Sequence, residues 1–126
     1  MAQGECVRSL ETIRINRLGF RGRMVPERKG PREIRIFVLG GSSAFNSNSP
    51  GGNTWPRLLE KRLQGRFGPS VRVVNAATPG FTTHQSALRL KCHLLCLSPD
   101  LVLVYHLWND VKYFGKSDIP RLIRDL

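Results

Sequence analysis

Three loops of this sequence hold residue types that could work together in acyl transfer. Ser42 directly follows an apolar segment that ends in Gly40 and Gly41, and Gly80 and Asn109 each follow another apolar segment. A serine hydroxyl can attack an acyl carbon, while backbone N–H groups and a side-chain amide stabilise the oxyanion that forms. We therefore predict Ser42 as a nucleophile, with Ser42, Gly80 and Asn109 as oxyanion donors. The alternative is an ordinary strand-to-loop turn in which Ser42 only caps a helix.

The apolar segments predict the elements that would position these residues. Residues 34–40 are a near-continuous run of Ile, Phe, Val and Leu, which is typical of a strand covered on both faces. Val71–Val74 and Leu101–Tyr105 predict two more strands, and apolar spacing predicts helices at about 54–66 and 83–97. This alternation indicates an α/β fold with a doubly wound parallel sheet. Parallel strands place their carboxyl ends at one edge, so the three loops are expected to meet there.

The two predicted helices each show an apolar face. Asn53 or Thr54 can cap the first helix, and Pro56 fits its first turn. Its predicted apolar face consists of Trp55, Leu58, Leu59 and Leu63. The predicted inner face of the second helix consists of Leu88, Cys92, Leu95 and Cys96. Cys92 and Cys96 are therefore expected to be buried thiols.

The amino-terminal residues predict a lead-in to the sheet. Thr12–Asn16 alternates between polar and apolar residues and predicts a short strand. Leu18–Gly22 predicts a turn that fixes one aromatic side chain, Phe20, against the rest of the fold. We expect residues 1–32 to form an amino-terminal extension and lead-in, and residues 33–126 to form the domain.

Composition limits the function classes. The chain has 126 residues, enough for one domain, and 20 Lys and Arg against nine Asp and Glu give a net charge of +11. The excess is scattered along the sequence, so we expect solvated faces and no nucleic-acid partner. Three cysteines form no disulfide framework and no zinc-like cluster, so no metal or cofactor is expected. No secretory signal and no membrane-spanning segment is recognised, which leaves the compartment open.

The order of these motifs resembles the SGNH (GDSL-type) ester hydrolase superfamily, named for blocks that contribute Ser, Gly, Asn and His. The similarity covers about residues 13–114, including a lead-in similar to Ile15–Gly22. The matching blocks are Leu39-Gly40-Gly41-Ser42-Ser43, Asn75-Ala76-Ala77-Thr78-Pro79-Gly80 and Trp108-Asn109-Asp110. The resemblance implies a three-layer α/β/α, flavodoxin-like doubly wound parallel sheet, truncated to about three strands. It also implies catalytic Ser42 and an oxyanion hole of Ser42, Gly80 and Asn109.

The chain departs from the family pattern in three places. Gly41 stands where the GDSL pattern has Asp, and Leu107 replaces the Gly of Gly-x-Asn-Asp. The Asp-x-x-His block, which supplies the base and its orienting acid, is missing: no histidine lies three residues after Asp100, Asp110, Asp118 or Asp125. Without a base, a serine hydroxyl is a poor nucleophile.

Two histidines and two tryptophans near the edge complete the set of candidate site residues. His106 and His84 are the remaining candidates for a base. The alternatives are a strand-end histidine that donates to the backbone, for His106, and a polar residue in the first helical turn, for His84. Trp55 and Trp108 could line an acyl or sugar pocket, although the helical spacing of Trp55 also fits a core residue.

The sequence therefore predicts an SGNH-type serine ester hydrolase by resemblance, acting on a small-molecule ester or an acylated carbohydrate. This chain would hold the nucleophile and oxyanion half, would be inactive alone, and would lack a carboxyl-terminal portion. The alternative is a non-catalytic binding module or relic of that fold. A phosphate-binding domain with Gly40–Ser43 as cradle lacks the Gly-x-Gly-x-x-Gly and Gly-Lys-Ser/Thr patterns. A basic nucleic-acid binder would need arginines and lysines clustered on one face.

Overall fold

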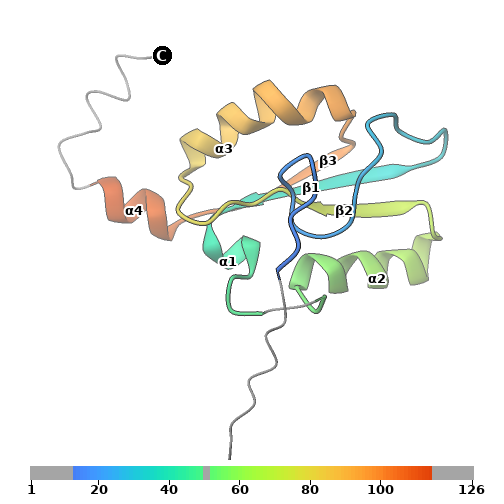
Figure 1. Ribbon diagram of the computed structural model, residues 1–126, viewed down its shortest axis with the longest axis horizontal. Coiled ribbons are helices and arrows are strands. Elements are labelled where there is room, and N and C mark those ends of the chain that lie inside the picture. The colour runs from blue at the N-terminus through green and yellow to red at the C-terminus, as the bar shows by residue number, and fades with distance from the viewer. Residues whose placement is uncertain (1–12, 50–51, 115–126) are drawn as a thin grey trace, which may run out of the picture.

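The computed structural model describes residues 13–49 and 52–114, which form a parallel sheet of three strands with helices on both faces (Figure 1). The strands are β1 (Ile34–Gly40), β2 (Val71–Asn75) and β3 (Leu101–Tyr105), in the spatial order β2-β1-β3. In the register of the sheet, Phe37 of β1 lies between Val74 and Val102. All three predicted strands are confirmed.

Helices cover the sheet in two layers. The short helix α1 (Ser42–Phe45) and α2 (Trp55–Phe67) lie on one side (Figure 1). On the other side, α3 (Thr83–Arg89) continues into a π-helical turn, η1 (Leu90–Leu94), and a 3₁₀ turn, η2 (Leu95–Leu97). Helix α4 (Trp108–Phe114) follows β3. This arrangement confirms the predicted α/β/α class with a small parallel sheet.

Strand β1 forms the centre of the core because its side chains are buried on both faces. Phe37 and Leu39 pack with Leu94 and Leu97 of the α3 side. Val38 packs in the opposite direction, against Ala44 of α1. Successive side chains of β1 are buried on opposite faces of the sheet, which explains why its sequence is a continuous apolar run and does not alternate with polar residues.

The helix predicted over 83–97 is confirmed, but its predicted inner face is wrong. Leu88 and Leu95 are 46% and 56% exposed, and Cys92 and Cys96 are exposed free thiols. Leu94 and Leu97 are buried instead. The inner face already begins at Ser86, which is 2% exposed and precedes the π-helical turn, so Leu88 and the residues at helical spacing from it face solvent.

Helix α2 begins at Trp55, as predicted, but a different residue stabilises its amino terminus. Thr54 is the N-cap and makes no capping hydrogen bond through its side chain. Asn46 Oδ1 accepts a hydrogen bond from the Trp55 N–H at 3.0 Å. The predicted apolar face is correct only in part, because Leu58 is 45% exposed. Glu60 is buried and forms an ion pair with Arg57.

The lead-in folds back onto the sheet. Asn16 Oδ1 accepts hydrogen bonds from the N–H groups of Leu18 and Phe20, and Gly19 has a positive φ of 77°. Phe20 is 2% exposed, so the predicted turn that fixes this aromatic ring is confirmed. Of the strand predicted at 12–16, Thr12 lies outside the described residues. Among residues 13–16, only Ile15 makes a β-bridge, to Arg21, which in turn bridges Asn75 of β2.

A charged network closes the amino-terminal end of the sheet. The side chain of Arg35 is fully buried, and its Nε lies 2.7 Å from Glu33 Oε1. Its Nη1 donates to the Leu97 carbonyl at 2.8 Å. The Arg35 backbone N–H donates to Asp100 Oδ2 at 2.6 Å, and Asp100 also pairs with Lys29. Glu33 therefore supplies the carboxylate that balances the buried Arg35 charge.

We expect Glu33→Gln to lower the free energy of unfolding by about 3 kcal/mol or more, because it leaves the buried Arg35 guanidinium without an anionic partner. Urea denaturation followed by circular dichroism measures this change. Glu27→Gln, at an exposed carboxylate, is the control and should change stability by no more than about 0.5 kcal/mol. Equal effects of the two substitutions would contradict this account of Arg35.

The same network predicts a loss of stability in acid. Burial raises the pKa of Glu33, but the hydrogen bonds from Arg35 and Gly30 and the charges of Arg35 and Arg72 outweigh it, so the net shift is downward. The pKa of Asp100 is lowered mainly by its hydrogen bond from Lys29 and also by the Arg35 N–H. Carboxyls with lowered pKa values add stability above their unfolded pKa of about 4. This stability should fall as the pH drops through the folded pKa values.

Urea midpoints measured from about pH 6 down to about pH 3 test this prediction. The Glu33→Gln chain should show a flatter pH dependence than the parent chain, since one of the two carboxyls is gone. Identical slopes for the two chains would count against a lowered Glu33 pKa.

Candidate active site

Ser42 lies at the carboxyl end of β1, where two glycines allow an unusually close approach of the backbone. Gly40 ends the strand, Gly41 caps α1, and the exposed Ser42 is the first residue of that helix. A Cβ atom on Gly40 would lie 2.5 Å from the carbonyl oxygen of Tyr105 and would also collide with Ala44. Because Gly41 has an ordinary φ of −87°, these glycines provide space rather than a special backbone conformation.

Asn109 lies beside this turn. A Cβ atom on Gly41 would lie 2.7 Å from Asn109 Nδ2. Asn109 Nδ2 donates a hydrogen bond to the carbonyl of Phe81 at 2.8 Å, and Phe81 directly follows Gly80. Gly80 is exposed and has a positive φ of 83°. The segments that carry Ser42, Gly80 and Asn109 thus meet at one edge of the sheet, as the strand order requires.

The buried side chain of Asn75 supports this edge, a role that its place in the sequence does not predict. Asn75 Nδ2 donates to the Ala44 carbonyl at 3.2 Å, and its Oδ1 accepts from the Ala77 N–H at 3.2 Å. The side chain therefore ties the end of β2 to α1. An asparagine at the end of an apolar strand was the only signal in the sequence for this contact.

His106 is held by a side chain of α3. His106 Nε2 lies 2.7 Å from Ser86 Oγ, and its Nδ1 lies 3.9 Å from Asp110 Oδ2. Asp110 in turn accepts hydrogen bonds from the N–H and hydroxyl of Thr83, at 2.8 and 3.0 Å. The partner of His106 is thus a hydroxyl rather than the backbone. Within the described ranges, no hydrogen bond joins the Ser42 hydroxyl to His106 or to the half-buried His84.

Ser86, His106 and Asp110 follow the order of a serine-histidine-aspartate triad, but their surroundings do not suit catalysis. Ser86 is only 2% exposed, so an ester carbonyl cannot reach its hydroxyl. The Nδ1–Oδ2 separation of 3.9 Å is also longer than a hydrogen bond. These residues instead join α3 to the residue after β3 and to the first turn of α4, which carries Asn109.

The two tryptophans differ in exposure. Trp55 is half-buried, packs edge-to-face on Tyr105 with ring centroids 6.2 Å apart, and donates from Nε1 to the Ser43 carbonyl at 3.3 Å. Trp108, immediately before Asn109, is 76% exposed. Trp55 is therefore part of the packing under α1, whereas Trp108 is accessible to a ligand at the sheet edge.

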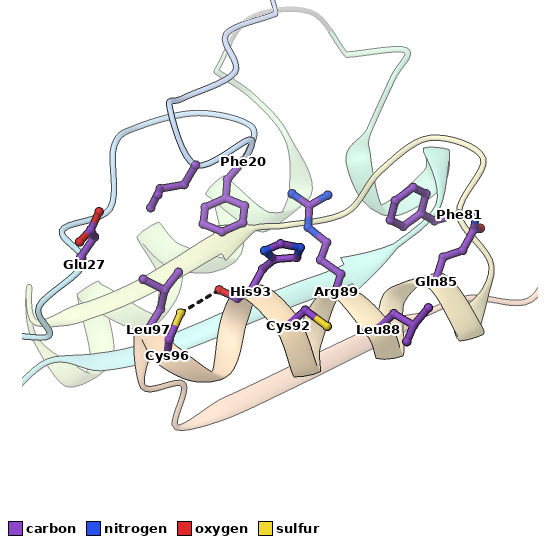
Figure 2. Close-up of a pocket in the computed structure, with 11 residues that line it drawn as sticks. Phe20, Glu27, Phe81, Gln85, Leu88, Arg89, Cys92, His93, Cys96 and Leu97 are labelled. Carbon is purple, nitrogen blue, oxygen red and sulfur yellow. Dashed lines mark hydrogen bonds between the residues drawn. The ribbon is translucent and has the colours of Figure 1, made fainter. Parts of the chain in front are cut away.

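A cavity of about 850 Å³ runs along α3 and η1, on the opposite side from α2 (Figure 2). Phe81 and Gln85 line one end, nearest the candidate site, and Glu27 and Leu97 line the other. Arg89 reaches across it to donate to the Gly19 carbonyl at 2.9 Å, and burial lowers the pKa of its guanidinium. Cys92, His93 and Cys96 lie along the same cavity, but no group of three metal-binding side chains gathers among the described residues.

Of the described helices, none is long and apolar enough to cross a membrane.

Comparison with known proteins finds solved structures of esterases. No protein-family model matches the chain, and no curated protein matches it either. AlinE4, an esterase of the SGNH-hydrolase family, is 26% identical to this chain with a TM-score of 0.57, and the match covers 68% of this chain and 46% of AlinE4. A single-residue variant of AlinE4 is 27% identical with a TM-score of 0.56, and the match covers 66% of this chain and 44% of the variant.

The structural neighbours of this chain are thus SGNH-hydrolase family esterases, in agreement with the resemblance read from the sequence motifs. The chain spans less than half the length of these solved structures.

The contact between Gly41 and Asn109 predicts an energetic coupling. Gly41→Ala should lower the free energy of unfolding by about 1–3 kcal/mol, because the new methyl group collides with Asn109 Nδ2. In an Asn109→Ala background the cost should shrink by at least about 0.5 kcal/mol, since that collision is removed. A double-mutant cycle by urea denaturation measures both effects.

Gly65→Ala is the matched control for this cycle. Gly65 lies in the exposed part of α2, with open space where a Cβ would be placed, so alanine should stabilise the chain by about 0.5–1 kcal/mol. Additive effects of Gly41→Ala and Asn109→Ala would mean that the two residues do not meet as described.

Proposed function

We propose that this chain carries the nucleophile and oxyanion half of an SGNH-type serine ester hydrolase, acting on a carboxylic or carbohydrate ester. The observation that supports the proposal is the meeting of three separate segments, which follow β1, β2 and β3, at one sheet edge. There Asn109 Nδ2 lies against Gly41 and donates to the Phe81 carbonyl. The esterase neighbours have the same kind of fold.

Each residue has a defined part in the proposed reaction. Ser42 Oγ forms a bond to the ester carbon and loses its proton to a base, and the carbonyl oxygen becomes an oxyanion. The N–H groups of Ser42 and Gly80 donate to that oxyanion. Asn109 contributes the N–H of its amide that Phe81 does not use, because an amide nitrogen carries two hydrogens. The oxyanion then re-forms the carbonyl, the bond to the alcohol breaks and the alcohol takes the proton back from the base, after which water hydrolyses the acyl-serine.

The base is proposed to come from outside the described residues. His106 Nε2 is engaged by Ser86, and in the ranges that the structure covers neither His106 nor His84 is hydrogen-bonded to Ser42. The esterase neighbours are more than twice as long as the region that matches them. We therefore expect the isolated chain to bind esters but to turn them over slowly or not at all.

A non-catalytic binding module is the second candidate. The observation that favours it is the lack of a hydrogen bond between the Ser42 hydroxyl and either edge histidine, His84 or His106, within the described ranges. Such a module would keep the exposed edge beside Trp108 as a binding surface for an ester or acylated ligand. The two candidates differ in whether Ser42 becomes reactive once a base is provided.

Labelling with a fluorophosphonate probe, with and without added imidazole, separates them. The proposal predicts little labelling of the chain alone and clear labelling of Ser42 when imidazole accepts its proton. Asn109→Ala should lower the imidazole-dependent rate by about 100-fold, which is the usual effect of losing one oxyanion donor. Gel fluorescence against time gives the rates, and circular dichroism confirms that each variant is folded.

Ser42→Ala should abolish this labelling, and Ser43→Ala, at the neighbouring exposed serine, is the matched control that should retain it. A folded chain that imidazole never activates would favour the binding module. Rapid labelling of Ser42 without imidazole would show that the chain already holds a base, and would overturn the proposal that the base comes from elsewhere.

A further inference from the structure

A second cavity, also lined in part by the lead-in, has several positively charged residues around it. It has a volume of about 770 Å³ and lies between the lead-in, α2 and β2. Its charged lining consists of Arg14, Arg21, Arg23, Arg57, Arg72 and a single carboxylate, Glu60. Five arginines thus line one space, although they come from three separate stretches of the sequence.

The nearby carboxylates balance only part of this charge. Glu60 is paired with Arg57, and Arg72 Nε lies 3.5 Å from Glu33 Oε1, which also neutralises Arg35. Among the described residues, Arg14, Arg21 and Arg23 form no ion pair with a carboxylate. The cavity therefore keeps a net positive charge.

Arg21 shows the imbalance most clearly because it is only 7% exposed. Its guanidinium donates to the carbonyls of Phe45 and Asn46, both at 2.8 Å, and to that of Ser49. These acceptors are neutral and lie outside the cavity lining, and the guanidinium also lies 5.0 Å from the centroid of the Phe45 ring. Among the described residues Arg21 thus has no anionic partner of the kind that Glu33 provides for the buried Arg35. Loss of solvent lowers the pKa of Arg21, so its charged form is disfavoured and a nearby anion would stabilise it.

The rest of the lining is partly polar and partly apolar. Thr54 and Gln64 add polar side chains, and Gly22 and Gly52 leave open space around their backbones. The apolar part of the lining consists of Met24, Val25, Pro56, Pro69, Val73 and Val74. Guanidinium groups match the oxygens of phosphate in a bidentate manner, and several of them favour more than one negative charge. A volume of several hundred Å³ is typical of a small-ligand site.

We infer that this cavity binds a compact multivalent oxyanion of the phosphate class, such as the diphosphate group of a small ligand. This site is separate from the candidate active site, because its lining contains none of Ser42, Gly80 and Asn109. The inference therefore stands or falls independently of the proposed esterase function.

Isothermal titration of the full chain with inorganic pyrophosphate tests the inference. We expect saturable binding to a single site and a rise in Tm with pyrophosphate concentration. The double variant Arg14→Gln/Arg23→Gln should weaken binding at least about tenfold, since two charge-assisted contacts are lost. Both side chains are exposed, and only their backbone carbonyls serve as hydrogen-bond acceptors, so folding should be preserved.

Arg32→Gln/Arg62→Gln is the charge-matched control. These arginines are exposed and lie outside the cavity lining, so the variant loses the same net charge and should keep its affinity within about twofold. Equal weakening in the two double variants would show diffuse attraction by the whole surface and would overturn the inference, as would the lack of saturable binding.

Titration with a single-stranded oligonucleotide, between about 50 and 200 mM salt, tests whether the arginines instead form a nucleic-acid surface. The oligonucleotide could bind more tightly than pyrophosphate, with an affinity that falls steeply with salt and is weakened equally by both double variants. This result would indicate a nucleic-acid surface and would overturn the proposed site. Weak binding of the oligonucleotide beside selective loss of pyrophosphate binding in Arg14→Gln/Arg23→Gln would support it.

Discussion

The close approach of backbones at Gly40 and Gly41 is the constraint on which the rest of this molecule depends. At Gly40, the end of β1 touches both α1 and the last carbonyl of β3. At Gly41, it touches the side chain of Asn109, which in turn binds the carbonyl after Gly80. Any larger side chain at either position would separate these segments. The turn at these two glycines therefore fixes the positions of the sheet edge, the short helix α1 and the candidate site.

Much of this arrangement could be predicted from the sequence, because it depends on local rules. Continuous apolar runs identified the three strands, and the shared direction of parallel strands predicted that the segments after them meet at one edge. The turn that buries Phe20 was also predictable, because Gly19 can adopt the positive φ that the turn requires. What the loops do chemically stays a prediction, since proximity of Ser42, Gly80 and Asn109 is a condition for catalysis and not its proof.

Other features depend on contacts between distant residues and were missed for that reason. The side-chain partner of His106 is Ser86, which lies on another element and looks like an ordinary helix residue in the sequence. The charge pattern is similar: the arginines seemed scattered, but the lead-in folds back across β2 and brings Arg14, Arg21 and Arg23 towards α2. Charge counted along a chain says little about charge density in space.

The face that residues 83–97 turn towards the sheet has a chemical consequence as well as a geometric one. Ser86, Leu94 and Leu97 are its buried positions, whereas Cys92 and Cys96 are exposed. Both thiols therefore lie along the rim of a cavity and not in apolar packing, which would shield them from reagents. The orientation of this one helix thus places the two thiols at the surface, where oxidants and alkylating agents reach them.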